Sequence, residues 1–73
     1  MAGEKEFYSS KFMEILKARG GKASYTDIHG ALLNEAYKSF NRFRFDIENK
    51  VIEDLIKKGI VKREADVFML SEG

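Results

Sequence analysis

Cationic and amide side chains gather in two stretches of this 73-residue chain and could bind a polyanion. Arginine and lysine bind phosphate oxygens, and an asparagine amide can make paired hydrogen bonds to an adenine edge. The residues are Lys38, Asn41, Arg42, Arg44 and Asn49 in the middle of the chain, with Lys62 and Arg63 near its end. An alternative interpretation is that these side chains form only a solvated basic rim.

The charge balance limits how strong such a site can be. Thirteen Lys and Arg oppose twelve Asp and Glu, so the net charge is +1 and a histone-like basic coat is excluded. The charge is uneven, because residues 38–63 carry eight bases and four acids, a net of +4. A polyanion would therefore meet its most favourable field over this segment.

Three phenylalanines alternate with these polar residues. Phe40, Phe43 and Phe45 could form a stacking platform for single strands or RNA. Phe40 and Phe43, however, continue the helical spacing of Ile47 and Val51, which favours a place in the core. Phe45 falls off that face, so we expect it to be exposed.

Residues for catalysis or metal binding are scarce. The chain has no cysteine and a single histidine, His29, so a zinc site has nothing to build from. No nucleophile elbow, phosphate-cradling glycine loop or dinucleotide fingerprint is present. We expect no metal, no cofactor and no enzymatic activity, and a structural role for His29 at the surface.

The elements that must position these groups follow from periodicity. Apolar residues at helical spacing, among them Tyr8, Phe12 and Leu16, predict a helix over residues 4–18 that ends at the Gly20–Gly21 pair. A brief extended link follows, and Ser24 with Asp27 three residues later resembles a capping box for a second helix, with Thr26 as the other candidate cap.

Residues 38–45 are the hardest to assign. Either Ser39 caps a third helix early, or the stretch is a loop and Asp46 is the cap. From Ile47 an apolar stripe predicts a helix that ends at Gly59. On this helix three acid-before-base pairs are spaced to support it, Asp46–Lys50, Glu53–Lys57 and Asp54–Lys58.

The last segment reads as a hairpin. Residues 60–63 and 67–70 are β-type runs around a three-residue turn, Glu64-Ala65-Asp66. The predicted order is helix, short strand, helix, helix, strand, strand, in one α+β domain over residues 1–73.

This order resembles the winged-helix family, a helix-turn-helix variant closed by a β-hairpin wing. The likeness covers roughly residues 5–71 and is carried by Ser24-Tyr25-Thr26-Asp27-Ile28 and by Leu55-Ile56-Lys57-Lys58-Gly59-Ile60-Val61. The stretch between Leu32 and Leu55 is longer than in compact bacterial regulators. The resemblance implies duplex DNA binding by a small regulator, with the third helix in the major groove and the wing on the backbone.

On that implication, Arg42 and Arg44 would contact phosphates or base edges, and Lys62 and Arg63 would hold flanking phosphates. The same fold also serves as a protein-docking module, which the near-neutral charge and the acids of the third helix favour.

Two further expectations concern assembly and location. Phe7 and Met13 lie outside the main stripe of the first helix and would permit a homodimer through it. The N-terminal residues contain no apolar signal core, and no apolar run is long enough to span a bilayer, so we expect a cytoplasmic protein without membrane contact.

Overall fold

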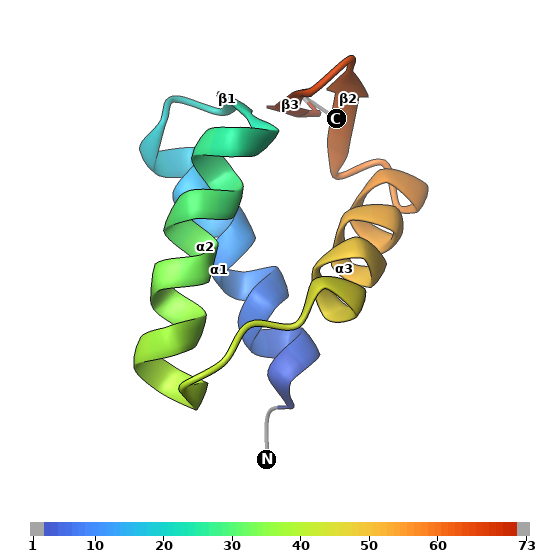
Figure 1. Cartoon of the computed structure of the whole chain (residues 1–73). Coiled ribbons are helices and arrows are strands. Elements are labelled where there is room, and N and C mark those ends of the chain that lie inside the picture. Colours follow the sequence, from blue (N-terminus) through green and yellow to red (C-terminus); the bar gives the residue numbers. More distant parts are fainter. Residues whose placement is uncertain (1–2, 72–73) are drawn as a thin grey trace.

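The computed structural model describes residues 3–71, which form three helices and a three-stranded antiparallel sheet (Figure 1). In chain order the elements are α1 (Glu4–Ala18), β1 (Lys22–Ser24), α2 (Tyr25–Phe40), α3 (Phe45–Lys57), β2 (Val61–Glu64) and β3 (Val67–Leu70). The predicted α+β class and element order are confirmed. Within the described residues, no helix is long and apolar enough to cross a bilayer.

Helix α1 forms as its periodicity predicts. Tyr8, Phe12 and Leu16 are buried along one face. Beyond its last turn, Gly20 and Gly21 have φ of +79° and +87°. Glycine adopts this left-handed backbone without the steric cost of a Cβ, so the pair ends the helix and turns the chain into β1.

Helix α2 begins at its predicted cap but ends later than either alternative allowed. The Ser24 hydroxyl accepts a hydrogen bond from the Asp27 amide at 3.2 Å. The helix runs through Ser39, which therefore caps nothing, and stops where Asn41 turns left-handed at φ 57°. The long stretch noted between Leu32 and Leu55 thus lies partly in the last turns of α2.

Helix α3 follows after a short loop, residues 41–44. Its N-cap is Arg44, whose side chain makes no cap hydrogen bond, and Asp46 lies within the first turn rather than at the cap. The helix ends before Gly59, which has φ of +73°.

The sheet has the strand order β1-β3-β2, so β3 is central and β1 and β2 are edges. The β2–β3 hairpin, the wing, pairs Val61 with Leu70 and Glu64 with Val67. Its turn is therefore two residues, Ala65 and Asp66, and not the predicted three. Ala65 supplies the positive φ, 54°, in place of the missing glycine.

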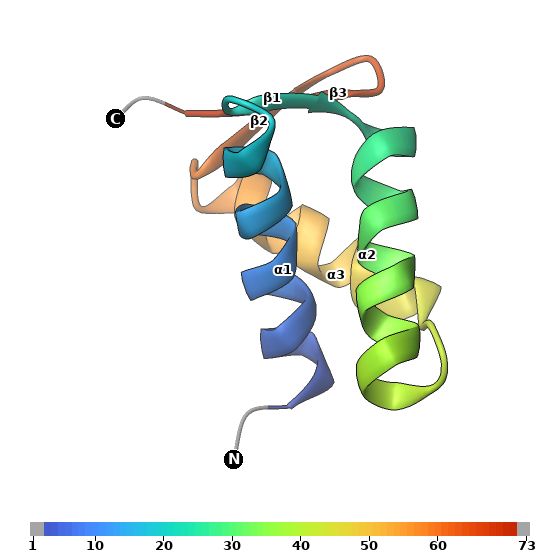
Figure 2. The ribbon, with the colours of Figure 1, turned by 90° about the vertical axis from the view of Figure 1, so that its left-hand side faces the viewer.

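The core lies where α1 packs against both α2 and α3, with the sheet across one end of the helices (Figure 2). Phe7 and Met13 pack against this core, and the Phe7 ring meets Phe40 edge-on at 5.1 Å. Both side chains are half-buried, so a homodimer through the first helix stays a prediction. Phe40 and Phe43 pack on the core as predicted, and Phe45 is 58% exposed, also as predicted.

Candidate functional site

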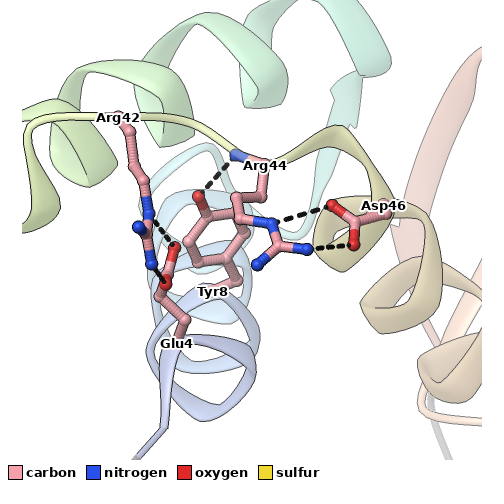
Figure 3. A network of polar contacts seen from close by, with 5 residues as sticks. All are labelled: Glu4, Tyr8, Arg42, Arg44 and Asp46. Atoms are coloured by element: carbon pink, nitrogen blue, oxygen red, sulfur yellow. Dashed lines mark hydrogen bonds and ion pairs between the residues drawn. The ribbon is translucent and has the colours of Figure 1, made fainter.

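The first predicted phosphate ligand, Arg42, is bound to a carboxylate of α1 (Figure 3). Its Nη2 donates to Glu4 Oε1 and its Nε donates to Oε2 at 3.4 Å. The Arg42 guanidinium lowers the pKa of Glu4 from its usual 4.5, and the carboxylate raises the pKa of Arg42. This arginine joins the α2–α3 loop to the start of α1.

The second predicted phosphate ligand, Arg44, is bound to Asp46 in the first turn of α3. Its Nη2 donates to Asp46 Oδ2 at 2.7 Å and its Nε to Oδ1 at 3.2 Å, a bidentate pair (Figure 3). The hydrogen bonds from Arg44 lower the pKa of Asp46. Each arginine is therefore paired with a carboxylate at the protein surface before any ligand approaches.

The backbone at the start of α3 is engaged as well. The Arg44 amide donates to the Tyr8 hydroxyl at 2.8 Å, and burial raises the pKa of Tyr8. Free backbone amides at a helix start can bind an anion. The Arg44 amide does not do so, because it ties the loop to α1.

The three other predicted residues of the middle stretch are exposed. Lys38, 75% exposed, lies 3.9 Å from the Glu35 carboxylate. Asn41 ends α2 in a left-handed conformation, which asparagine tolerates better than most residues. Asn49 is on the solvent side of α3.

Lys62 and Arg63 lie on β2, and within residues 3–71 no carboxylate is in ion-pair distance of either. Lys62 is exposed, opposite Met69 of β3. The Arg63 guanidinium lies over the Phe68 ring, 5.2 Å from its centroid, and its Nε donates to the Ala65 carbonyl at 2.9 Å.

The structure brings Arg42 and Arg44 together, and Lys62 and Arg63 together, but not the two groups. They lie at opposite ends of α3 (Figure 1). A helix of 13 residues is about 20 Å long, so no single phosphate bridges them. Nucleic-acid binding by these seven residues stays a prediction.

A buried carboxylate, which was not among the predicted site residues, links α2 to α3. Glu48 is 1% exposed. It accepts hydrogen bonds from the Tyr25 hydroxyl at 2.6 Å and from His29 Nδ1 at 2.7 Å. Burial and the bond to Glu48 raise the pKa of Tyr25 to about 12. The signal was in the spacing, because Glu48 shares the buried stripe of Val51, Ile52 and Leu55.

Aromatic rings extend this cluster to the surface. The His29 ring stacks on Tyr25 at 5.2 Å and on Phe45 at 5.3 Å, and Phe43 meets it edge-on at 5.1 Å. His29 is therefore a packing and hydrogen-bonding residue. In the part of the chain that the structure describes, no three His, Cys, Asp or Glu side chains are placed to hold a metal ion.

The exposed side chains of residues 50–70, from the middle of α3 through the wing, form what we call the wing surface, and they present a different mixture. Two large apolar side chains are exposed, Ile56 at 39% and Ile60 at 40%. The predicted intrahelical pairs do not form among the described residues, since Asp54 binds Lys5 of α1 at 2.5 Å. Five bases of the wing surface have no carboxylate in ion-pair distance within the described chain: Lys50, Lys57, Lys58, Lys62 and Arg63.

A shallow groove follows β2 on this surface. Its volume is about 840 Å³, and it is lined by all four β2 residues, by the ends of α3 and β3 and by the Gly20–Gly21 turn. Ile56, Met69 and Leu70 give it apolar contacts, and Lys62 and Arg63 give it positive charge.

Comparison with known proteins gives a fold and no family. No protein-family model matches the sequence, and no curated protein shows significant similarity. Among solved structures, the chain is similar to Dcn1(P)–Cdc53(WHB), determined in work on a dual E3 mechanism for Rub1 ligation to Cdc53. The TM-score is 0.80 at 17% identity, over 93% of this chain and 79% of the other. The protein thus has the winged-helix fold, like the Cdc53 WHB domain.

Proposed function

We propose that this protein is a protein–protein docking module that binds its partner through the wing surface. The observation that carries the proposal is the contrast between the two ends of α3. The arginines at its start are bound to Glu4 and Asp46, whereas the bases beside the exposed Ile56 and Ile60 at its end have no carboxylate in ion-pair distance among residues 3–71. Exposed apolar groups inside a polar rim are the common composition of protein interfaces.

Carboxylates on the expected DNA-facing surfaces weigh against duplex DNA. The exposed face of α3 carries Asp46 and Glu53, and the wing carries Glu64 and Asp66 at its tip. Phosphates repel these groups, and the wing tip is where this fold would touch the DNA backbone. The likeness to the WHB domain of Cdc53, solved with Dcn1(P), supports a protein partner at the level of the fold.

The test compares two exposed apolar sites at opposite ends of the molecule. The Ile56→Ser/Ile60→Ser variant removes the apolar groups of the wing surface, and Tyr37→Ser, at a residue 51% exposed, is the matched control. Proteins captured from a lysate of the source cells are purified and their binding to each variant is measured. We expect a purified partner that binds the wild type and the control and loses about tenfold in affinity for the double variant.

The rival function, duplex DNA binding, is tested by titrating the wild type and Arg42→Ala/Arg44→Ala with duplex DNA at several salt concentrations. If all four predicted cations held phosphates, log K would fall against log salt with a slope of about −4. With Arg42 and Arg44 already paired, the slope would be about −2 and would not change in Arg42→Ala/Arg44→Ala. A slope of about −4 that this double variant reduces, with no purified protein sensitive to Ile56 and Ile60, would refute the docking function.

A further inference from the structure

Strand β2 leaves one edge of the sheet open. It pairs with β3 and, among residues 3–71, with no other strand. In Figure 1 no element covers the side of β2 that faces away from β3. An open strand edge presents unpaired N–H and C=O groups that can pair with another chain.

The register identifies the open groups. The Ser71 amide donates to the Ile60 carbonyl at 2.9 Å, so Ile60 turns its hydrogen-bonding groups toward β3. In an antiparallel ladder this direction alternates, and Lys62 and Glu64 therefore also face β3. The N–H and C=O groups of Val61 and Arg63 point outward. A strand added here would bond to Val61 and Arg63.

The groove along β2 provides more than backbone groups. Ile56, at the end of α3, lines it and is exposed, so it gives an incoming side chain an apolar contact. Gly59, at φ +73°, has no side chain and no heavy atom within 4 Å of where a Cβ would be, so the groove is open at the start of β2. Backbone pairing and an apolar contact together are the features of recognition by strand addition.

The charge of the strand selects the partner. Lys62 and Arg63 line the groove, and Glu64 is its one acid. Opposite charges on neighbouring strands stabilise pairing, and like charges facing one another destabilise it. An acidic strand therefore fits the edge better than a basic or neutral one.

A second copy of the chain fits less well. The two-fold register that uses Val61 and Arg63 of both copies places Lys62 opposite Lys62. Because like charges would meet at the centre of that interface, the edge favours a different chain.

We propose that β2 and its groove bind an extended acidic segment of a partner protein by antiparallel strand addition, with an apolar side chain of the segment against Ile56. The inference rests on the proposed docking function and specifies the chemistry of the partner.

The experiment titrates the isotope-labelled full chain with a short peptide of alternating glutamate and valine, followed by NMR. We expect shifts centred on β2, and slower hydrogen exchange at the amides of Val61 and Arg63. The control peptide, with lysine in place of glutamate, should bind about tenfold more weakly because its charge opposes that of β2.

Two variants of one residue separate backbone pairing from charge. Arg63→Pro and Arg63→Gln both remove the positive charge, but only proline removes the outward N–H. Proline is tolerated on an edge strand where the N–H faces solvent, so the fold should survive. We expect Arg63→Gln to weaken the peptide about threefold and Arg63→Pro by a further tenfold or so.

Folding is checked from the dispersed NMR signals of Phe68. If proline proves to disturb the fold, a peptide N-methylated at the residues that face Val61 and Arg63 makes the same test on the wild type, and it should not bind.

Several results would overturn the inference. These are absence of binding by the acidic peptide, equal binding of the N-methylated peptide, or shifts centred on the Tyr25–His29–Phe45 cluster. Self-association of the chain that Arg63→Gln strengthens would show that the edge serves a second copy. If the peptide fails but a purified partner still depends on Ile56 and Ile60, strand addition is wrong and the docking function stands.

Discussion

A pair of basic residues flanks each end of helix α3, but the two ends present different surfaces. At its start, Arg42 and Arg44 are each bound to a carboxylate, and the Arg44 amide donates a hydrogen bond to the Tyr8 hydroxyl. At its end, Lys62 and Arg63 have no such partner among the described residues, and Ile56 and Ile60 are exposed beside them. The number of bases in a segment therefore does not give the charge available to a ligand.

The difference has a structural origin. The loop of residues 41–44 passes over α1, which supplies Glu4 and Tyr8 from a distant part of the chain (Figure 3). The wing extends past the last turn of α3, and the outer edge of β2 pairs with no strand in the part of the chain that the structure describes (Figure 1). A segment that packs against a helix acquires partners for its polar groups, while a protruding edge does not.

The largest effect should come from removing the carboxylate that holds the start of α3. Glu48→Ala leaves the Tyr25 hydroxyl and His29 without their acceptor, and we expect it to lower the free energy of unfolding by about 3 kcal/mol. Glu53→Ala, on the exposed face of the same helix, should change it by less than about 0.5 kcal/mol. Urea denaturation measures both, and equal stabilities would show that Glu48 does not fix this end.

Removal of one hydroxyl should have a smaller effect at the same end. Tyr8→Phe deletes the acceptor of the Arg44 amide, and we expect a loss of about 1 kcal/mol in the free energy of unfolding. Tyr37→Phe removes an exposed hydroxyl and serves as the control. Hydrogen exchange at the Arg44 amide should quicken only in Tyr8→Phe. Unchanged exchange there would mean that the loop is held by its ion pairs alone.

The comparison of the two ends can be made at constant net charge. Arg42→Ala and Lys62→Ala each remove one positive charge, but only Lys62 lacks a carboxylate partner in the described structure. We expect Lys62→Ala to elute from heparin at a lower salt concentration than Arg42→Ala does, by a small margin set by one contact. The reverse order would place the anion-binding surface at the start of α3.

The smallest expected effect is a change in the loss of stability at low pH. The ion pairs with Arg42 and Arg44 lower the pKa values of Glu4 and Asp46 in the folded chain. Their contribution to stability is therefore complete above the unfolded values of 4.5 and 3.8, and it is lost as the pH falls through the lower folded values. Denaturation midpoints should fall less below about pH 4.5 in Arg42→Ala/Arg44→Ala than in the wild type. If the midpoints of the two proteins fell equally with pH, the ion pairs of Arg42 and Arg44 would not be present in solution.

Much of the fold follows from local patterns that the sequence displays. The bounds of α1, the Ser24 cap, the glycine exits and the hairpin depend on residues close together in the chain, and all were predicted to within a few positions. The end of α2 was not, because Phe40 and Phe43 keep helical spacing across the break at Asn41. Periodicity cannot place a break that lies between two residues of the same apolar stripe.

The candidate site was less predictable than the fold. The pairs expected four residues apart on α3 gave way to Asp54 with Lys5 and Asp46 with Arg44. Glu48 was not among the predicted site residues, although its place in the buried stripe indicated the core. A carboxylate is buried only where donors reach it, and the donors here come from Tyr25 and His29 on another helix.

The order of elements, the helix ends at glycine and the near-neutral charge were thus determined by the sequence alone, because each depends on composition or on neighbours within a few residues. The tertiary structure alone decided which of the described bases lack a carboxylate partner, where the buried Glu48 finds its donors and which strand edge lies open. Each of these properties depends on a partner, or on the lack of one, far away along the chain, and only the folded chain brings such residues within hydrogen-bonding distance.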